Sequence, residues 1–232
     1  MNKERIWELD ALRGLCIWGM IAIHLLFDLT ALSGAVDFVY PPWLLFLMDW
    51  GGVAFFLISG ICATLGSRCV RRGLAVLGCG LVISGVIWAM YRLGFVPKAM
   101  CIYFGVLHCL GGCMILWALG RKLPNWALGM LGILLVALGL WMGTITVECR
   151  WLFWLGLVYP GFATSDYFPL LPFLGFFLLG GLLGRWLYPQ KRSLLPNWKG
   201  LPLLQWTGRH SLLIYLLHQP ILTAVVFLID WL

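Results

Sequence analysis

Charged side chains are scarce in this sequence. Of its 232 residues only 11% are Asp, Glu, Lys or Arg, and 62% are hydrophobic, whereas soluble domains carry about 25% charged and about 45–50% apolar residues. A chain with so little polar sequence cannot cover a water-soluble particle. The composition therefore excludes a soluble enzyme, a disordered chain and a nucleic-acid-binding module.

The sequence also lacks a Cys-x-x-Cys pair. Its eight cysteines lie mostly inside apolar runs, where a thiol acts as a small apolar core group. We therefore predict neither a disulfide framework nor a metal site.

Long apolar runs are what the chain has instead. A membrane-crossing helix needs about 20 mainly apolar residues, and seven runs approach that length. We predict an all-α, polytopic membrane helical bundle in which residues 1–232 form one domain. The seven expected crossings are residues 12–32, 43–65, 73–91, 101–119, 126–142, 170–187 and 211–232.

A further apolar stretch, residues 151–159, is too short to cross a bilayer. As a helix it would extend about 14 Å at 1.5 Å per residue. We expect an interfacial or re-entrant segment there, tolerated only against protein or water. The alternative is a short tilted crossing, which would reverse the orientation of everything after it.

The positions of the basic residues give the orientation. With a cytoplasmic N-terminus, the inner segments hold most of the Lys and Arg, and the outer segments keep Arg92, Lys98 and Arg150 together with three acids. This asymmetry follows the positive-inside rule and favours seven crossings with the C-terminus outside. The inner set is Lys3, Arg5, Arg68, Arg71, Arg72, Arg121, Lys122, Arg185, Lys191, Arg192, Lys199 and Arg209.

Three ionisable residues of the first run share one helix face. Arg13 and His24 are eleven residues apart, about three full turns and about 16 Å along the axis, and Asp28 follows one turn later. A guanidinium suits phosphate, a neutral imidazole is a general base, and an adjacent acid can orient it. Asp28 is expected within reach of the imidazole, directly or through a water. The alternative is that Arg13 pairs with Asp10 or lipid phosphate and that His24 and Asp28 are a satisfied buried pair.

The remaining candidates are weaker. His108 and His218 lie inside expected helices, where a histidine is either a catalyst or a packed core residue. Asp166 and Tyr167 lie in an outer loop and are candidates for contacts with a polar acceptor, with an ordinary solvated loop as the alternative. Arg68, Arg72 and Arg121 are chiefly topology determinants, and some of them are candidates for binding an anionic ligand.

Residues 9–14 (LDALRG), followed by an apolar helix and His24, resemble the opening of the transmembrane acyltransferases, whose acyltransferase-3 branch has an Arg, ten residues and a His. Three further strings resemble the branch of heparan-alpha-glucosaminide N-acetyltransferase and its small bacterial relatives. They are FFLISG at 55–60, GVLH at 105–108 and GRHSLLIY at 208–215.

This resemblance implies acyl transfer across a membrane, here the bacterial inner membrane. The donor would be cytoplasmic acyl-CoA, most simply acetyl-CoA, and the acceptor a glycan or small-molecule hydroxyl or amine outside. Carried onto this chain, His24 is the catalytic base and Arg13 steadies the donor. Asp28 is expected to orient His24. Either His108 or a backbone N–H is expected to stabilise the oxyanion. No metal is expected.

Several alternatives stay open. Heparan-type members place a catalytic histidine in the loop after their first core helix, but residues 29–42 here contain none, so the acceptor is undetermined. The small size makes a homodimer plausible. A proton-coupled carrier using His24, Asp28, His108 and His218 is the main rival function, and a non-catalytic scaffold is the second.

Overall fold

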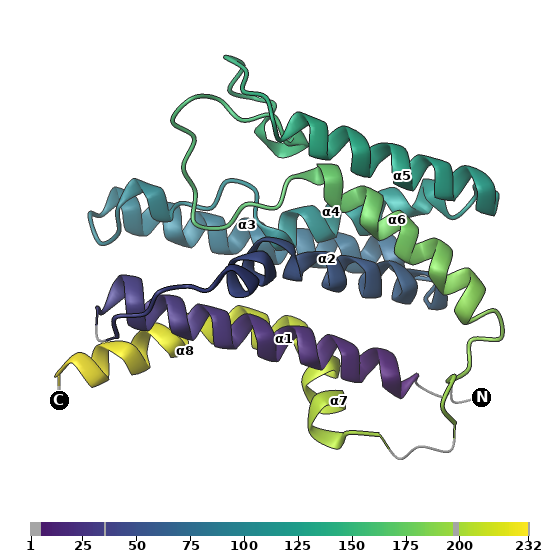
Figure 1. Cartoon of the computed structure of the whole chain (residues 1–232), viewed down its shortest axis with the longest axis horizontal. Coiled ribbons are helices and arrows are strands. Elements are labelled where there is room, and N and C mark those ends of the chain that lie inside the picture. Colours follow the sequence, from purple (N-terminus) through teal and green to yellow (C-terminus); the bar gives the residue numbers. More distant parts are fainter. Residues whose placement is uncertain (1–5, 35, 197–199, 232) are drawn as a thin grey trace. The chain divides into compact units, whose positions relative to one another are not determined.

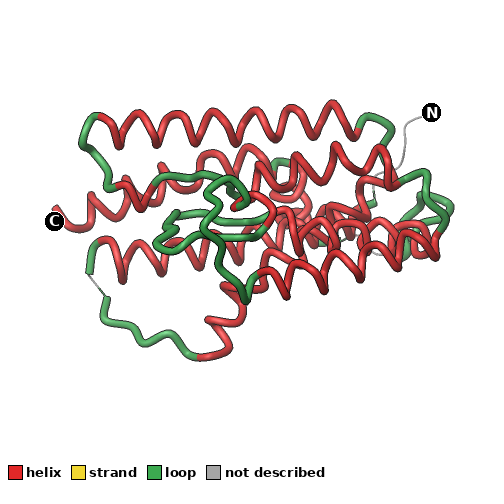
Figure 2. Tube along the Cα trace, turned by 90° about the horizontal axis from the view of Figure 1, so that it is seen from above, coloured by secondary structure: helices red, strands yellow, loops and turns green. Residues whose placement is uncertain are grey.

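The computed structural model describes residues 6–34, 36–196 and 200–231, so Lys3, Arg5 and Lys199 of the orientation argument lie outside the described residues. Within those ranges the chain is helical: Figure 2 shows helices joined by loops, with no strand in the described part. The elements in order are α1 (Trp7–Phe27), η1 (Asp28–Leu32), α2 (Pro42–Leu65), α3 (Cys69–Arg92), η2 (Lys98–Met100), α4 (Val106–Gly120), α5 (Asn125–Met142), η3 (Phe153–Leu155), α6 (Leu170–Leu187), α7 (Pro202–Arg209) and α8 (Ser211–Trp231).

The apolar runs become helices in the predicted places. Among the described residues, six helices are long and apolar enough to cross a membrane, namely α1, α2, α3, α5, α6 and α8. The remaining predicted crossing, residues 101–119, becomes the shorter helix α4, which begins at Val106 and has 15 residues. The prediction of an all-α polytopic membrane protein is confirmed.

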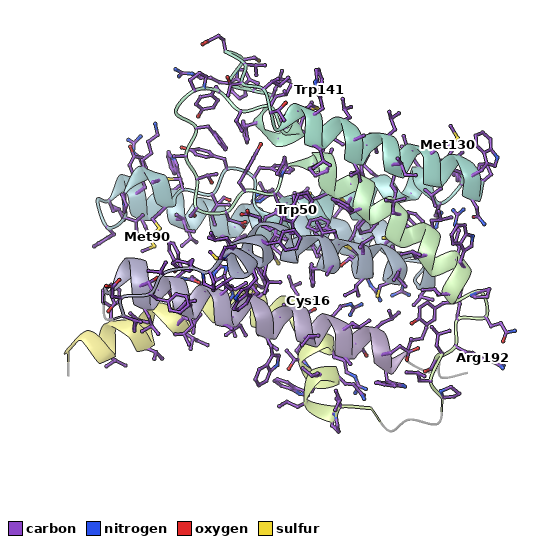
Figure 3. All side chains as sticks on the ribbon, in the orientation of Figure 1. Cys16, Trp50, Met90, Met130, Trp141 and Arg192 are labelled. Atoms are coloured by element: carbon purple, nitrogen blue, oxygen red, sulfur yellow. The ribbon has the colours of Figure 1, made fainter. Side chains whose placement is uncertain are left out.

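The faces of these helices are apolar where a bilayer would contact them. Met130 and Trp141 of α5, labelled in Figure 3, are 65% and 60% exposed. Large exposed apolar side chains also line α3, among them Leu81 and Val82. In water such surfaces would aggregate, whereas in lipid they need no cover.

Residues 151–159 do not form a helix that could cross. The segment contains the three-residue turn η3 and then runs beside residues 146–147, where the N–H of Val147 donates to the carbonyl of Val158 at 3.0 Å. The short tilted helix considered as an alternative is therefore not formed.

The sequence does not predict helix α7. Residues 189–202 are expected to be a cytoplasmic loop, but a helix begins at Pro202, a residue suited to the first helical turn. It has eight residues, and Leu203 and Trp206 on it are exposed. Hydropathy windows of about 19 residues miss so short a helix. The string at 208–215 consequently spans the break between α7 and α8 at His210 instead of opening one helix.

Contacts between Cα atoms divide the chain into two compact units. Unit 1 comprises Met1–Ile58 and Gln190–Leu232, and unit 2 comprises Ser59–Pro189, so that α2 belongs to both. The prediction of one domain over the whole chain stays a prediction.

In unit 1, α1 packs against α7 and α8, the purple and the yellow-green to yellow helices of Figure 1. The crossing of α1 and α7 depends on two glycines. A Cβ on Gly14 would collide with the carbonyl of Leu204, and a Cβ on Gly208 would collide with the carbonyl of Asp10. Only residues without a side chain let the two backbones approach this closely.

In unit 2, α3 packs on α4, α5 packs on α6, and α4 joins α6. At the α3–α4 and α5–α6 contacts, a glycine of one helix faces a glycine of the other. A Cβ on Gly73 or on Gly111 would lie 2.8 Å from the other's carbonyl oxygen. A Cβ on Gly175 of α6 would lie 2.7 Å from the carbonyl oxygen of Gly132 of α5, and one on Gly132 would lie 3.3 Å from that of Gly175. These close contacts replace the hydrophobic driving force that helices lack in lipid.

We predict that Gly73→Ala lowers the melting temperature of the detergent-purified protein, because its methyl group overpacks the α3–α4 contact, at a cost of about 1–3 kcal/mol. Gly78→Ala on the same helix is the matched control, since nothing lies within 4 Å of its added Cβ. It should leave stability unchanged or raise it by about 0.5–1 kcal/mol through helix propensity. Equal melting temperatures for the two variants would contradict the packing account.

Candidate functional site

The site is centred on His24, near the end of α1. Asp28 follows one turn later, where the helix widens into the π-helical turn η1, a feature that is frequent at functional sites. Asp28 is 1% exposed. A carboxylate buried to this degree must find hydrogen-bond donors.

The donor is Gln219 of α8. Its side-chain Nε2 lies 3.0 Å from each carboxylate oxygen of Asp28, and its Oε1 lies 2.8 Å from Nδ1 of His24. Among the described residues no hydrogen bond joins Asp28 to His24 directly. The expected link between acid and imidazole therefore exists, but a glutamine amide takes the place of direct contact or a water.

His218, the neighbour of Gln219, also reaches His24. Its Nε2 lies 3.4 Å from Nδ1 of His24, and the two rings meet edge to face with centroids 5.0 Å apart. Its Nδ1 lies 2.6 Å from the carbonyl oxygen of Tyr215. His218 is buried.

The positions of the hydrogens in this network follow from whether each atom can donate or only accept. A carboxylate accepts only, so the NH₂ end of Gln219 faces Asp28 and its oxygen faces His24. Nδ1 of His24 must then carry the hydrogen. A carbonyl also accepts only, so His218 carries its hydrogen on Nδ1 and turns the lone pair of Nε2 toward His24.

A neutral His24 therefore has its lone pair on Nε2. No hydrogen bond to this atom is found in the described ranges, and the side chain is half-buried. An imidazole with a fixed tautomer and an open nitrogen can take a proton from a nucleophile.

Arg13 lies on α1 in the same unit and contacts Asp10, with Nη1 and Oδ1 3.5 Å apart. Arg209 of α7 approaches the other oxygen of Asp10 at 3.4 Å. The pairing considered as an alternative for Arg13 is thus present, and two guanidiniums share one carboxylate. Their combined charge stays positive, so binding of an anion is not precluded.

The other predicted donor-binding residues, Arg68, Arg72 and Arg121, belong to unit 2 and have exposed side chains. Arg185 holds the loop after α4 by donating to the carbonyl oxygens of Arg121 and Leu123, each at 2.8 Å. Sequence reasoning gave Arg185 a role in topology alone.

His108 also belongs to unit 2, in the first turn of α4. Its Nδ1 accepts the N–H of Gly105 at 3.3 Å, and its ring packs beside Phe104 and Gly80. Asp166 accepts the N–H of Val106 at 3.1 Å, so it caps the same helix end. Both contacts are structural, and the catalytic and acceptor-binding roles of these two residues stay predictions.

Tyr167 donates its hydroxyl to the carbonyl of Phe153 at 2.7 Å. Its ring packs on Phe162, with centroids 5.1 Å apart, within a loop cluster that includes Tyr103 and Phe153. Burial raises the pKa of Tyr167 to about 12. Binding of an acceptor by Tyr167 stays a prediction.

The sequence did not single out Gln219, and His218 was a weaker candidate, either a catalyst or a packed core histidine, and a member of the rival carrier's relay. Both are polar residues inside an apolar run, adjacent to each other and followed by Pro220. That pattern was the available signal. Among the described residues no group of three or more His, Cys, Asp or Glu could hold a metal ion.

We predict that Tyr167 titrates near pH 12 and not near the ordinary value of 10. Because its folded-state pKa is raised, the stability it contributes is complete below about pH 10 and is lost as the pH rises through about 12. A pH jump followed by phenolate absorbance, compared with Tyr167→Phe, isolates its signal. If the wild-type protein gained phenolate absorbance near pH 10 that Tyr167→Phe lacks, the prediction would be contradicted.

One comparison with known families matches nearly the whole chain. Residues 5–220 match the family model described as heparan-alpha-glucosaminide N-acetyltransferase, catalytic. No curated protein and no solved structure matches the chain. The matched region contains α1 and most of the loops, and it includes His24, Asp28, His218 and Gln219. The chain belongs to the heparan-alpha-glucosaminide N-acetyltransferase catalytic family, a family of membrane acetyltransferases.

Proposed function

We propose that this protein transfers an acetyl group from acetyl-CoA to a hydroxyl or amine of a sugar-type acceptor, with His24 as the general base. The family membership supports the reaction class. The observation that carries the residue assignment is the hydrogen-bond network that leaves Nε2 of His24 open.

The transfer is direct. The acceptor's O–H or N–H gives its proton to Nε2 of His24 while the oxygen or nitrogen attacks the thioester carbonyl. The new C–O or C–N bond forms, the C–S bond breaks, and the proton passes from His24 to the departing thiolate. The imidazolium formed in between is stabilised by Oε1 of Gln219 and by the charge of Asp28 behind it.

The donor end is basic. Arg13 stands about 16 Å along α1 from His24, at 1.5 Å per residue, which is of the order of an extended pantetheine arm. Its guanidinium can exchange Asp10 for a phosphate of the donor, because Arg209 also neutralises that carboxylate. Arg68, Arg72 and Arg121 are further candidates for the donor's phosphates.

His108 is proposed as a donor to the oxyanion. Its Nδ1 accepts a backbone N–H, so its own hydrogen is on Nε2 and is available for donation. Asp166 and Tyr167 are proposed to contact the acceptor from the outer loop. The protein would lie in a bacterial inner membrane with its N-terminus in the cytoplasm.

A proton-coupled carrier is the second candidate. The contact between Nδ1 of His24 and Nε2 of His218 inside the membrane favours it, since such pairs can pass protons. Release of free thiol from acetyl-CoA distinguishes the enzyme from the carrier.

We predict that His24→Ala lowers the rate of thiol release from acetyl-CoA by about 10²–10⁴-fold, the usual contribution of a general base. The assay uses the purified protein with a panel of amino sugars and hydroxy sugars as acceptors. His210→Ala is the matched control, because His210 is an exposed histidine of unit 1 outside the network. A His24→Ala variant as active as His210→Ala would overturn the assignment.

The proposed orientation makes a separate prediction. Cys149 is exposed and lies in the loop between α5 and α6, which would face outward. A membrane-impermeant maleimide should label intact spheroplasts that express the protein, and Cys149→Ser should remove this label. If Cys149 is labelled only after the membranes are permeabilised, the proposed orientation is wrong and the loop faces the cytoplasm.

A further inference from the structure

The hydrogen-bonded link between Asp28 and His24 runs through Gln219, because the carboxylate accepts from the amide NH₂ and the amide oxygen accepts from the imidazole. We propose that Gln219 is a positioning residue that determines which nitrogen of His24 is the base. This inference rests on the proposed function and names a residue for it that the sequence reasoning did not.

A glutamine amide suits this task because its two ends differ. One end donates and the other accepts, although they have nearly the same shape. With the oxygen toward His24, the hydrogen of the imidazole lies on Nδ1 and Nε2 is open. With the amide turned over, the NH₂ end would face Nδ1. The hydrogen would then move to Nε2 and block the base.

Asp28 fixes the amide in the productive orientation. Nε2 of Gln219 lies 3.0 Å from both carboxylate oxygens, and the carboxylate is 1% exposed. Turning the amide over would place its oxygen against a buried anion and remove the donor of that anion. Leaving a buried charged group unpaired is among the most costly changes in a protein.

His218 selects the same tautomer from a second direction. Its Nδ1 is tied to the carbonyl of Tyr215 at 2.6 Å, so its Nε2 is an acceptor facing Nδ1 of His24. Two independent acceptors therefore meet on one N–H. The shorter contact, 2.8 Å against 3.4 Å, belongs to Gln219, which makes the amide the principal determinant.

The test exchanges the charge between the two partners. In Asp28→Asn, the new amide can present either end to Gln219, so the orientation of Gln219 and the tautomer of His24 are no longer fixed. We expect kcat for thiol release from acetyl-CoA to fall about 10- to 100-fold, the range found when the hydrogen-bond partners of metal-binding histidines are removed. The KM for acetyl-CoA should not change.

Adding Gln219→Glu to Asp28→Asn should restore most of kcat. A carboxylate at position 219 accepts from the amide introduced at position 28 and from Nδ1–H of His24, so the productive tautomer returns. Gln219→Glu alone is the control, since it opposes two buried carboxylates and should lower both stability and kcat. Gln219→Leu, which has no acceptor for His24, should also lower kcat with KM unchanged.

The proposal is overturned if Asp28→Asn keeps wild-type kcat, if Gln219→Leu does, or if the double variant regains its melting temperature without regaining kcat. The last result would mean that Asp28 and Gln219 stabilise the fold and do no more. Failure of the proposed role of His24 gives a different result, because His24→Ala would then also release thiol from acetyl-CoA at the wild-type rate.

Discussion

The amide of Gln219 lies between a carboxylate and an imidazole, and the chemistry of the site depends on that one bridge. Asp28 is removed from solvent and can be satisfied only by a donor, so it fixes the amide. The fixed amide in turn gives His24 a single tautomer. A requirement for burying a charge inside a membrane protein thus becomes a requirement on where the lone pair of His24, the proposed base, lies.

The packing of unit 1 holds this bridge in register. His24 and Asp28 come from the first helix and its π-helical turn, whereas His218 and Gln219 come from the last helix. The backbones of α1 and α7 meet at Gly14 and Gly208, and α8 follows directly after α7. Close contact between small residues therefore determines which residues of distant segments meet at the site.

Hydropathy and length were enough to predict the long apolar helices, because a bilayer imposes both on any segment that crosses it. Spacing within one helix was enough to place His24 and Asp28 on one face. The same reasoning could not find Gln219, since its partners are more than 190 positions away and only tertiary packing brings them together. It missed α7 because eight residues after a loop carry no span-length signal. The local contacts of His108 and Asp166 could not be predicted either, because capping geometry depends on where the backbone is placed.

The tautomer of His24 is the most direct test of this account. Nitrogen-15 NMR of histidine-labelled protein in lipid nanodiscs, with His24 assigned by comparison with His24→Ala, distinguishes a protonated ring nitrogen from one that bears a lone pair. For the neutral ring the account predicts one form, with hydrogen on Nδ1 and a lone pair on Nε2. A His24 ring that carries its hydrogen on Nε2, or that populates both forms equally, would contradict it.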